Sequence, residues 1–288
     1  MKSRCSQLQL AAAQYEHSDL NPLIRWAGSK RQAIGALTPY WEASRRAKYV
    51  EPFCGSAAFF FNLEAPCAYL NDTNSILINA YRQLRHAPIK VHREVGAIPS
   101  DPDTYYRIRS QESTELEKFK QAVRFLYLNR YCFNGIYREN RQGVFNVPYG
   151  GKRVGSFPPL EEFCKGAKLL RGATLFSKDF EVFIKKVVDE SSFVYLDPPY
   201  AVSNVRTFRQ YSTSSFGFHD LNRLFEVLEF IDRCGGCFLL SYADSQEIRP
   251  FKKRWGHSSY VVKRSIAGFS KHRKKVNEIL ITNISESR

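Results

Sequence analysis

Short apolar runs and segments of helical periodicity alternate in the first third of the chain. Two runs are typical of strands: AKYVEPFCGS, which enters a glycine turn, and CAYLND, which ends at Asp72. The segments that follow them, FFFNLE and SILINAYRQLR, have apolar residues at helical spacing. A further short helix is predicted over residues 31–40, ending before Pro39. This order predicts an α/β fold with a parallel, doubly wound sheet.

The alternation stops between residues 86 and 170. A charged helical stretch, ESTELEKFKQAVRFLYL, precedes a passage rich in glycine, asparagine and proline that includes the alternating piece GVFNV. The alternation of strands and helices then returns with ATLFS, SSFVYLDPPY, the helix LNRLFEVLEFIDR and the strand GCFLLSYAD. The last predicted element is a hairpin of SSYVVKRSI and NEILITNI. We therefore predict a flexible tail at 1–19, one catalytic unit from 20–85 and 171–288, and an inserted module at 86–170.

The composition favours a folded protein that binds a polyanion. Of 288 residues, 43% are hydrophobic, which suffices for a packed core, and no apolar run approaches the roughly 18 residues of a membrane span. The net charge of +15 attracts nucleic acid or an anionic membrane surface. Residues 249–277 contain ten Lys or Arg and no acidic residue, and aromatic residues interleave with basic ones at 124–153. This distribution favours nucleic acid and predicts no membrane partner.

Cysteine and histidine give no sign of a structural framework. The seven cysteines lack paired spacing, which predicts reduced thiols and a cytoplasmic protein. Cys234 and Cys237 are interpreted as part of a glycine turn before a strand rather than as half of a zinc site. None of the six histidines has metal-ligand spacing with another His, Cys or carboxylate cluster, so we predict no metal.

The tetrapeptide Asp197-Pro198-Pro199-Tyr200 directly follows an apolar strand. Ligands of open α/β sheets bind outside the carboxyl ends of the strands. The exocyclic amine of a nucleobase is a poor nucleophile because its lone pair is delocalised into the ring, and hydrogen-bond acceptors localise that pair. Asp197 and the Pro198 carbonyl can each accept one N–H, and Tyr200 can stack on the base. The alternative is an ordinary turn at the end of a strand.

A glycine turn after the first strand, EPFCGSA at 51–57, is a candidate cofactor site. It lacks the G-x-G-x-x-G spacing that brings backbone amides to a pyrophosphate, so a nucleoside ligand without phosphates is favoured over NAD. Asp72, at the end of the next strand, could accept hydrogen bonds from both ribose hydroxyls. The alternative for Asp72 is the N-cap of the following helix.

Five segments in chain order resemble DNA adenine-N6 methyltransferases of the Dam type: RWAGSK, EPFCGS, LNRYCFNGIYREN with GVFNVPYG, DPPY, and RSIAGFSKHRKKVNEIL. The resemblance extends from about residue 21 to 283. It implies a Rossmann-like methyltransferase sheet with an inserted, mostly helical target-recognition domain. It also implies methyl transfer from S-adenosylmethionine, with S-adenosylhomocysteine as product, to N6 of a flipped adenine in double-stranded DNA, within GATC. The expected protein is a monomer of bacterial or phage type, associated with the nucleoid.

The resemblance also implies a set of cofactor contacts. Trp26 offers a flat apolar surface, and Lys30 offers a cation for a carboxylate such as that of the methionine moiety. The alternative interpretation of Trp26 is a buried core residue without a role in cofactor binding. The positions that match the family's cofactor-binding residues are Trp26, Lys30, Phe53, Asp72 and Asp197.

For DNA, the resemblance implies a recognition loop and hairpin. Arg138 is the candidate for bidentate contact with guanine, and Asn134, with Phe133 or Ile136, could fill the space left by the flipped adenine. A basic run near the C-terminus is expected to contact phosphates; it consists of Lys271, Arg273, Lys274 and Lys275. The alternative for the loop and the basic run is a solvated surface. The predicted DNA-binding residues are Asn134, Arg138, Asn140, Pro148, Lys152, Arg273 and Lys274.

The chain departs from the family pattern at several positions. Ser29 and Ala57 stand where glycine is usual, which we expect to weaken or alter cofactor affinity at most. Gly151 and Lys152 replace an arginine that often follows the PYG turn, and AGFSKH replaces a glycine-rich stretch. Three alternatives stay open: N4-cytosine methylation, whose amine poses the same electronic problem, methylation of RNA, and a non-catalytic DNA-binding relative.

Overall fold

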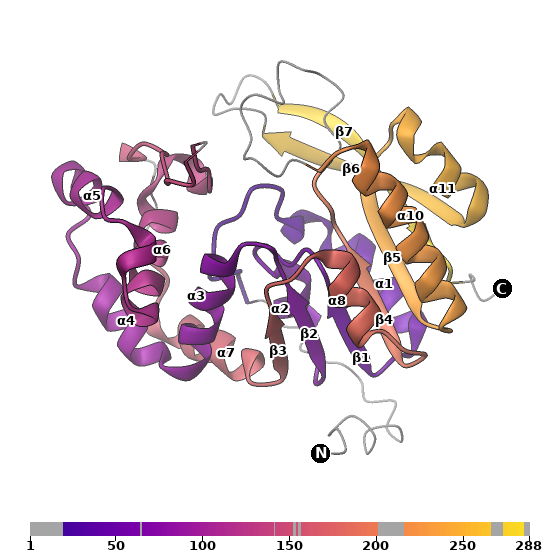
Figure 1. Ribbon diagram of the computed structural model, residues 1–288, viewed down its shortest axis with the longest axis horizontal. Coiled ribbons are helices and arrows are strands. Elements are labelled where there is room, and N and C mark those ends of the chain that lie inside the picture. Colours follow the sequence, from indigo (N-terminus) through magenta and orange to yellow (C-terminus); the bar gives the residue numbers. More distant parts are fainter. Residues whose placement is uncertain are drawn as a thin grey trace.

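The computed structural model describes residues 20–63, 65–140, 142–151, 154, 157–200, 216–265 and 273–284, with only the backbone described at 262–265 and 273–276. Within these ranges the chain forms a seven-stranded sheet of order β3-β2-β1-β4-β5-β7-β6 (Figure 1). The strands are β1 (Lys48–Glu51), β2 (Ala68–Asn71), β3 (Ala173–Phe176), β4 (Ser192–Leu196), β5 (Cys237–Ala243), β6 (Gly256–Ser265) and β7 (Arg273–Thr282).

Strands β1 to β5 are parallel, and β7 runs antiparallel to both β5 and β6. The predicted α/β class and the C-terminal hairpin are therefore confirmed, and the sheet is mixed. Every residue of β1 and β4 is buried, which is the pattern of strands covered on both faces. Because parallel strands share a direction, the segments after β1, β2 and β4 leave the sheet at one edge, where an open α/β sheet binds its ligands.

Helices cover both faces of the sheet and extend beyond its β3 edge. In Figure 1, α8 and α10 lie over one face, whereas α4, α5 and α6 form a group beside α3. The α-helices are α1 (Ile34–Ser44), α2 (Ala58–Leu63), α3 (Ser75–His86), α4 (Pro88–Gly96), α5 (Pro102–Arg109), α6 (Lys118–Tyr131), α7 (Leu160–Leu170), α8 (Phe180–Val187), α10 (Phe218–Arg233) and α11 (Arg249–Arg254). The 3-10 turns are η2 (Lys30–Ala33), η3 (Ser113–Glu115), η4 (Phe133–Gly135) and η6 (Gln246–Ile248).

The period of two along the central strands divides the core into two layers. Tyr49 and Phe193 pack on one face with Trp41 of α1. Their chain neighbours, including Val50 and Val194, pack on the other face with α8 and α10. The first layer continues into α5 and α6, whose buried tyrosines belong to the same apolar cluster. The helices between β2 and β3 are therefore packed against the sheet by a continuous core.

The expectation that the first helix ends before Pro39 is wrong. Helix α1 runs through Pro39 to Ser44, because Leu37 and Trp41 on either side of the proline are buried. The Thr38 hydroxyl also donates to the Ile34 carbonyl at 3.0 Å, which keeps the turn before the proline closed. Tertiary packing thus outweighs the local cost of a proline in the helix.

The cysteines divide into two groups among the residues that the structure describes. Cys54, Cys132, Cys164, Cys234 and Cys237 are free. Cys67 is disulfide-bonded, so the expectation of reduced thiols is wrong at this position. Spacing along the chain does not report which thiols the fold brings together. In the same described ranges, no helix has both the length and the apolar character needed to cross a membrane.

Candidate active site

The tetrapeptide Asp197–Tyr200 begins where β4 ends, at the centre of the sheet. Pro198 is buried, Pro199 is exposed, and the Asp197 side chain keeps 19% of its surface accessible. The Lys30 ammonium lies 2.7 Å from Asp197 Oδ1, and the Ser241 hydroxyl of β5 donates to the same oxygen at 3.3 Å. Two residues expected to serve cofactor and catalysis, Lys30 and Asp197, are thus an ion pair.

A sharp turn directs Lys30 toward this tetrapeptide. Gly28 has φ +80°, a conformation that L side chains rarely adopt, and the Ser29 N–H donates to the Trp26 carbonyl at 3.2 Å. The turn passes directly into η2, which begins at Lys30. Ser29, where the family usually has glycine, has φ −48° and is not strained. Its hydroxyl accepts from Ser56 at 2.9 Å, so it ties this turn to the segment after β1.

Burial and charge oppose one another at the ion pair. Burial raises the pKa of Asp197, and the adjacent Lys30 ammonium opposes that increase. Burial alone lowers the pKa of Lys30, but the combined effect of Asp197, Tyr200 and Glu278 raises it above the ordinary value. The short contact therefore favours the ionised form of both groups, against the effect of burial.

Glu278 on β7 was not anticipated from the sequence, yet it contacts this site. Its Oε2 lies 3.5 Å from the Lys30 ammonium, and its Oε1 accepts from the Tyr200 hydroxyl at 3.0 Å. Tyr260 of β6 donates to Oε2 at 2.5 Å. A glutamate within the otherwise apolar end of NEILIT was the only sequence signal, because buried carboxylates are rare unless they have partners.

The turn after β1 is joined to Asp72 by the backbone. Asp72 Oδ2 accepts from the Gly55 N–H at 3.0 Å, and Oδ1 accepts from the Asn74 N–H at 2.9 Å. Asn74 is the N-cap of α3, so Asp72 does not have the helix-capping role considered as its alternative. A carboxylate has about four acceptor positions, so two backbone bonds leave Asp72 able to accept further hydrogen bonds. Burial raises its pKa, against the effect of these two bonds.

Ala57 occupies a conformation that explains why glycine is common at its position. Its φ is +50°, in the left-handed region where a Cβ costs about 1 kcal/mol. The Ala57 N–H donates to the Cys54 carbonyl at 2.6 Å, which closes the turn. The substitution therefore strains the turn without opening it.

Trp26 lies between this turn and Tyr137. It stacks on Tyr137 with ring centroids 5.5 Å apart, and a Cβ added to Gly55 would lie 2.5 Å from its ring. The neighbouring Arg25 is fixed to α6, since its N–H donates to Asn129 Oδ1 at 2.9 Å and its carbonyl accepts from Asn129 Nδ2 at 2.6 Å. Trp26 is half-buried. Its ring therefore packs against its neighbours and keeps accessible surface for the expected cofactor contact.

Phe53 lies in an aromatic group rather than against the ion pair. Its ring is 5.3 Å from Phe180 and 6.2 Å from Phe216, and the Arg223 guanidinium lies over Phe180 at 4.6 Å. Half-buried Phe53 therefore offers an apolar surface at the end of β1.

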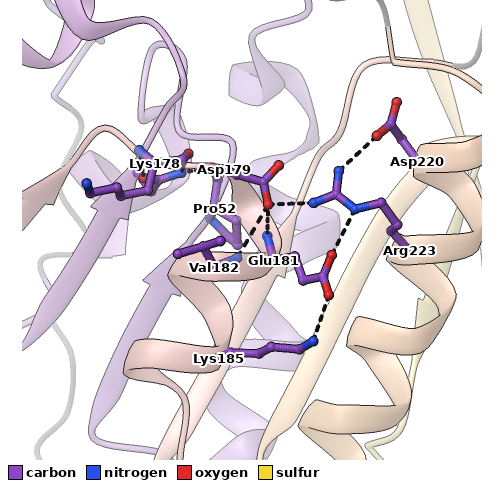
Figure 2. Close-up of polar contacts among 9 residues, drawn as sticks. Pro52, Lys178, Asp179, Glu181, Val182, Lys185, Asp220 and Arg223 are labelled. Atoms are coloured by element: carbon purple, nitrogen blue, oxygen red, sulfur yellow. Dashed lines mark hydrogen bonds and ion pairs between the residues drawn. The ribbon is translucent and has the colours of Figure 1, made fainter.

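An ionic network holds the helices beside this aromatic group (Figure 2). Arg223 of α10 contacts Asp179, Glu181 and Asp220 at 2.6, 2.8 and 3.0 Å, and Lys185 extends the network from Glu181 (Figure 2). Asp179 also caps α8 by accepting from the N–H groups of Glu181 and Val182 (Figure 2). The start of α8 is therefore fixed both to α10 and by its own N-cap.

The asparagine at the end of β2 connects the neighbouring strand ends. Asn71 donates to the carbonyls of Pro52 and Lys178, each at 3.0 Å, and accepts from the Lys178 N–H at 2.9 Å. Its side chain is fully buried. The ends of β1 and β3 are thus held at fixed positions on either side of Asp72.

The predicted recognition residues lie on a pair of short connected segments. Phe133 N–H donates to the Pro148 carbonyl at 2.9 Å, which places Asn134 near Pro148, and both of these residues are exposed. Asn134 has φ 56°, a conformation that asparagine tolerates. Arg138 is exposed, and its Nε donates to Asn146 at 2.8 Å. The structure therefore brings three of the predicted DNA contacts to one exposed region.

Asn140 has a structural role in the same region. Its side-chain oxygen accepts from the N–H groups of Gln142 and Val144 at 2.9 and 3.0 Å, which closes the turn of the hairpin. Lys152 lies outside the described residues, as does Lys271 of the basic run. Arg273 and Lys274 lie in β7, where only the backbone is described.

The strand order of the sheet is that of a Rossmann-like methyltransferase, and the tetrapeptide Asp197–Tyr200 directly follows β4. The family model for the D12 class N6 adenine-specific DNA methyltransferases matches residues 26–266, and the chain belongs to this family. It is an adenine-specific DNA methyltransferase, as the resemblance had implied. Among the described residues, no group of three or more His, Cys, Asp or Glu side chains is arranged to hold a metal ion.

Curated relatives match most of the chain. Retron Ec67 DNA adenine methylase of Escherichia coli is 33% identical over 91% of this chain and 90% of its own length. DNA adenine methylase of Escherichia coli strain K12 is 31% identical over 89% of this chain and 93% of its own. Type II methyltransferase M1.LlaDCHI of Lactococcus lactis subsp. cremoris is 30% identical over 92% of this chain and 96% of its own.

Proposed function

We propose that this chain transfers the methyl group of S-adenosylmethionine to N6 of an adenine flipped out of double-stranded DNA, within GATC. The observation that carries the proposal is Asp197, a mostly buried carboxylate at the end of β4 that keeps part of its surface accessible. We also propose that the protein acts as a monomer. The domain assignment also belongs to the proposal: residues 20–85 and 171–288 catalyse, and residues 86–170 recognise the target.

The chemistry follows from the acceptors after β4. Asp197 accepts one N–H of the adenine amine, and the Pro198 carbonyl accepts the other, which localises the nitrogen lone pair for attack. Tyr200 supports the base through its ring, and its own hydroxyl is held by Glu278. The target nitrogen is the nucleophile, so no covalent bond between protein and base is required. As the bond from N6 to the methyl group forms, the bond from the methyl group to sulfur would break and S-adenosylhomocysteine would leave. The surplus proton of the amine would pass to Asp197 or to water.

The residues at the neighbouring strand ends have the chemistry that S-adenosylmethionine requires. Asp72 would accept from the ribose hydroxyls, Phe53 would contact the adenine ring, and Trp26 would supply an apolar surface. Lys30 would attract the methionine carboxylate, and it is already held beside Asp197. When bound, the cofactor supplies an electrophilic methyl group on a sulfonium. In addition to its role as an acceptor, Asp197 would contribute a negative charge that favours binding of the sulfonium cation.

The exposed hairpin is proposed to read the DNA. Arg138 would contact guanine O6 and N7, while Asn134 would enter the duplex where the adenine has left. Asn140 and Pro148 would shape this surface, and Lys152, Arg273 and Lys274 would contact phosphates. The net charge of +15 supports a polyanionic substrate.

The test is a nucleoside digest of treated nucleic acids. Purified protein is incubated with labelled S-adenosylmethionine and a duplex that contains GATC, a duplex in which GATC is scrambled, or folded RNA. We expect labelled N6-methyladenine from the GATC duplex alone. N4-methylcytosine would indicate the cytosine reaction, and label in RNA would contradict the DNA substrate. A protein that binds the duplex but leaves every substrate unlabelled would be a non-catalytic relative.

A further inference from the structure

Glu278 belongs to β7, an interior strand between β5 and β6. In the register of the sheet it lies opposite Ala243 of β5 and Tyr260 of β6. Its side chain is only 2% exposed. An ionised side chain so deeply buried is costly unless partners compensate its charge. Its partners therefore indicate why the strand carries a carboxylate here.

The two oxygens of Glu278 contact three separate parts of the chain. Oε1 accepts from the Tyr200 hydroxyl at 3.0 Å, which attaches the strand to the catalytic tetrapeptide. Oε2 lies 3.5 Å from the Lys30 ammonium and accepts from the Tyr260 hydroxyl at 2.5 Å. Tyr260 thus fixes Glu278 within the sheet, and Glu278 in turn fixes two groups of the site.

Lys30 is consequently placed between two carboxylates. The Asp197 contact is 2.7 Å and the Glu278 contact is 3.5 Å, so the ammonium is drawn toward both. If Lys30 neutralised Asp197 alone, that carboxylate would be a weaker acceptor for an amine, because its charge would be compensated. A second anion beside Lys30 shares the positive charge and leaves more negative charge on Asp197.

We propose that Glu278 is a positioning residue for methyl transfer: it holds the Tyr200 hydroxyl and shares the Lys30 ammonium, so that Asp197 stays an effective acceptor for the target amine. Glu278 acts through Tyr200 and Lys30 and does not itself touch the base. The inference rests on the proposed role of Asp197. It assigns a function to the contact between Glu278 of β7 and a tetrapeptide that is distant in the sequence.

The experiment compares Glu278→Gln with the wild-type enzyme in steady-state methylation of duplex DNA. Glutamine keeps the size of the side chain and an oxygen for Tyr200 but removes the charge that faces Lys30. We expect kcat to fall about tenfold or more, and KM for DNA and for S-adenosylmethionine to change by less than about threefold. Such a split identifies an interaction used in the transition state rather than in binding.

A pH profile separates this role from a structural one. Several charged or titratable groups face Asp197: Lys30 of η2, Glu51 of β1, Tyr195 of β4, Tyr260 of β6 and Glu278 of β7. Of these, only the charge of Glu278 changes in the variant. Because Glu278 raises the pKa of Asp197, its loss should move the acidic limb of kcat to lower pH. A structural effect would lower kcat without moving the limb.

Thr282→Val is the matched control. Thr282 lies four residues along β7, about 13 Å away for an extended strand, is buried, and donates to the Phe238 carbonyl at 2.6 Å. It tests whether any damage to β7 lowers kcat. We expect Thr282→Val to reduce thermal stability with near-normal kcat and pH profile. An equal loss of kcat in Thr282→Val would overturn the proposal.

Two further variants apply if Glu278→Gln does not fold. Glu278→Asp keeps the charge and should retain the wild-type acidic limb, and Tyr200→Phe removes only the hydroxyl held by Oε1 and should lower kcat severalfold. A folded Glu278→Gln with wild-type kcat and limb, or a folded Tyr200→Phe with wild-type kcat, would refute the assignment. Absence of adenine methylation by the wild-type protein would instead refute the proposed function.

Discussion

The surroundings of Asp197 and the hairpin that carries Arg138 hold their polar groups in opposite environments. Around Asp197 the side chains of Lys30 and Glu278 are 9% and 2% exposed, and each contacts charged partners. Arg138 is exposed, and its Nε is oriented by Asn146. Chemistry on an amine requires acceptors that are already in position, whereas reading a sequence requires donors that a partner can reach. The comparison predicts different consequences for mutations in the two regions.

The largest expected effect is at Asp197. Replacing it by Ala removes the acceptor at the end of β4, and we expect kcat to fall by about 10³ or more with DNA binding largely intact. Methyl transfer and gel-shift assays measure the two quantities. The matched control is Asp189→Ala, since Asp189 precedes the same strand and pairs with Lys48 at 2.8 Å. Comparable losses in both variants, or substantial activity in Asp197→Ala, would contradict the role.

A smaller effect is expected at Arg138. Its loss should lower the preference for cognate over scrambled DNA by about 1–3 kcal/mol, or roughly 5- to 150-fold, with kcat on saturating DNA nearly unchanged. Competition binding with the two duplexes measures the preference. Arg93→Ala removes the same charge from an exposed position on α4 and should weaken both duplexes alike. An unaltered preference in Arg138→Ala would remove Arg138 from base recognition.

A third effect concerns stability and arises at Glu51, beneath the site. Burial raises the pKa of Glu51 well above its ordinary value, although the Tyr49 hydroxyl opposes the shift. The folded protein therefore keeps a proton that the unfolded chain loses. The resulting stabilisation is complete below about pH 4.3 and is lost as pH rises toward the folded pKa, by at most about 1.4 kcal/mol per pH unit.

Denaturant unfolding of wild type and Glu51→Gln across this pH range tests that sign. Asp72 and Asp197 also have raised pKa values and contribute slopes of the same sign in both proteins, so the difference between the curves reports Glu51 and its effect on these two carboxylates. The free energy of unfolding of the wild type should fall relative to Glu51→Gln as pH increases. Parallel curves would show that Glu51 binds no extra proton on folding.

Local patterns in the sequence predicted most strands and the position of Asp197. A short apolar run identified β4, and the proline pair after it marked the strand end. The same local reasoning failed at Pro39, because the burial of Leu37 and Trp41 depends on distant parts of the chain. It also failed to foresee the disulfide at Cys67.

The partners of the site residues were harder to predict than the residues themselves. Lys30 was expected to meet a cofactor carboxylate, and the sequence did not indicate that Lys30 also contacts Asp197 and Glu278. Nothing in the sequence near Glu278 indicates that the antiparallel return of β7 brings it beside the tetrapeptide. Trp26 is similar, since its contact with Gly55 depends on how the first turn packs against the end of β1. Long-range register decides these contacts.

The most direct measurement is a crystal structure of the chain with S-adenosylhomocysteine and a duplex that contains GATC. The account predicts an adenine outside the helix, with its N6 about 3 Å from both an Asp197 oxygen and the Pro198 carbonyl. An adenine stacked in the duplex, or an extruded base whose amine contacts neither acceptor, would contradict it.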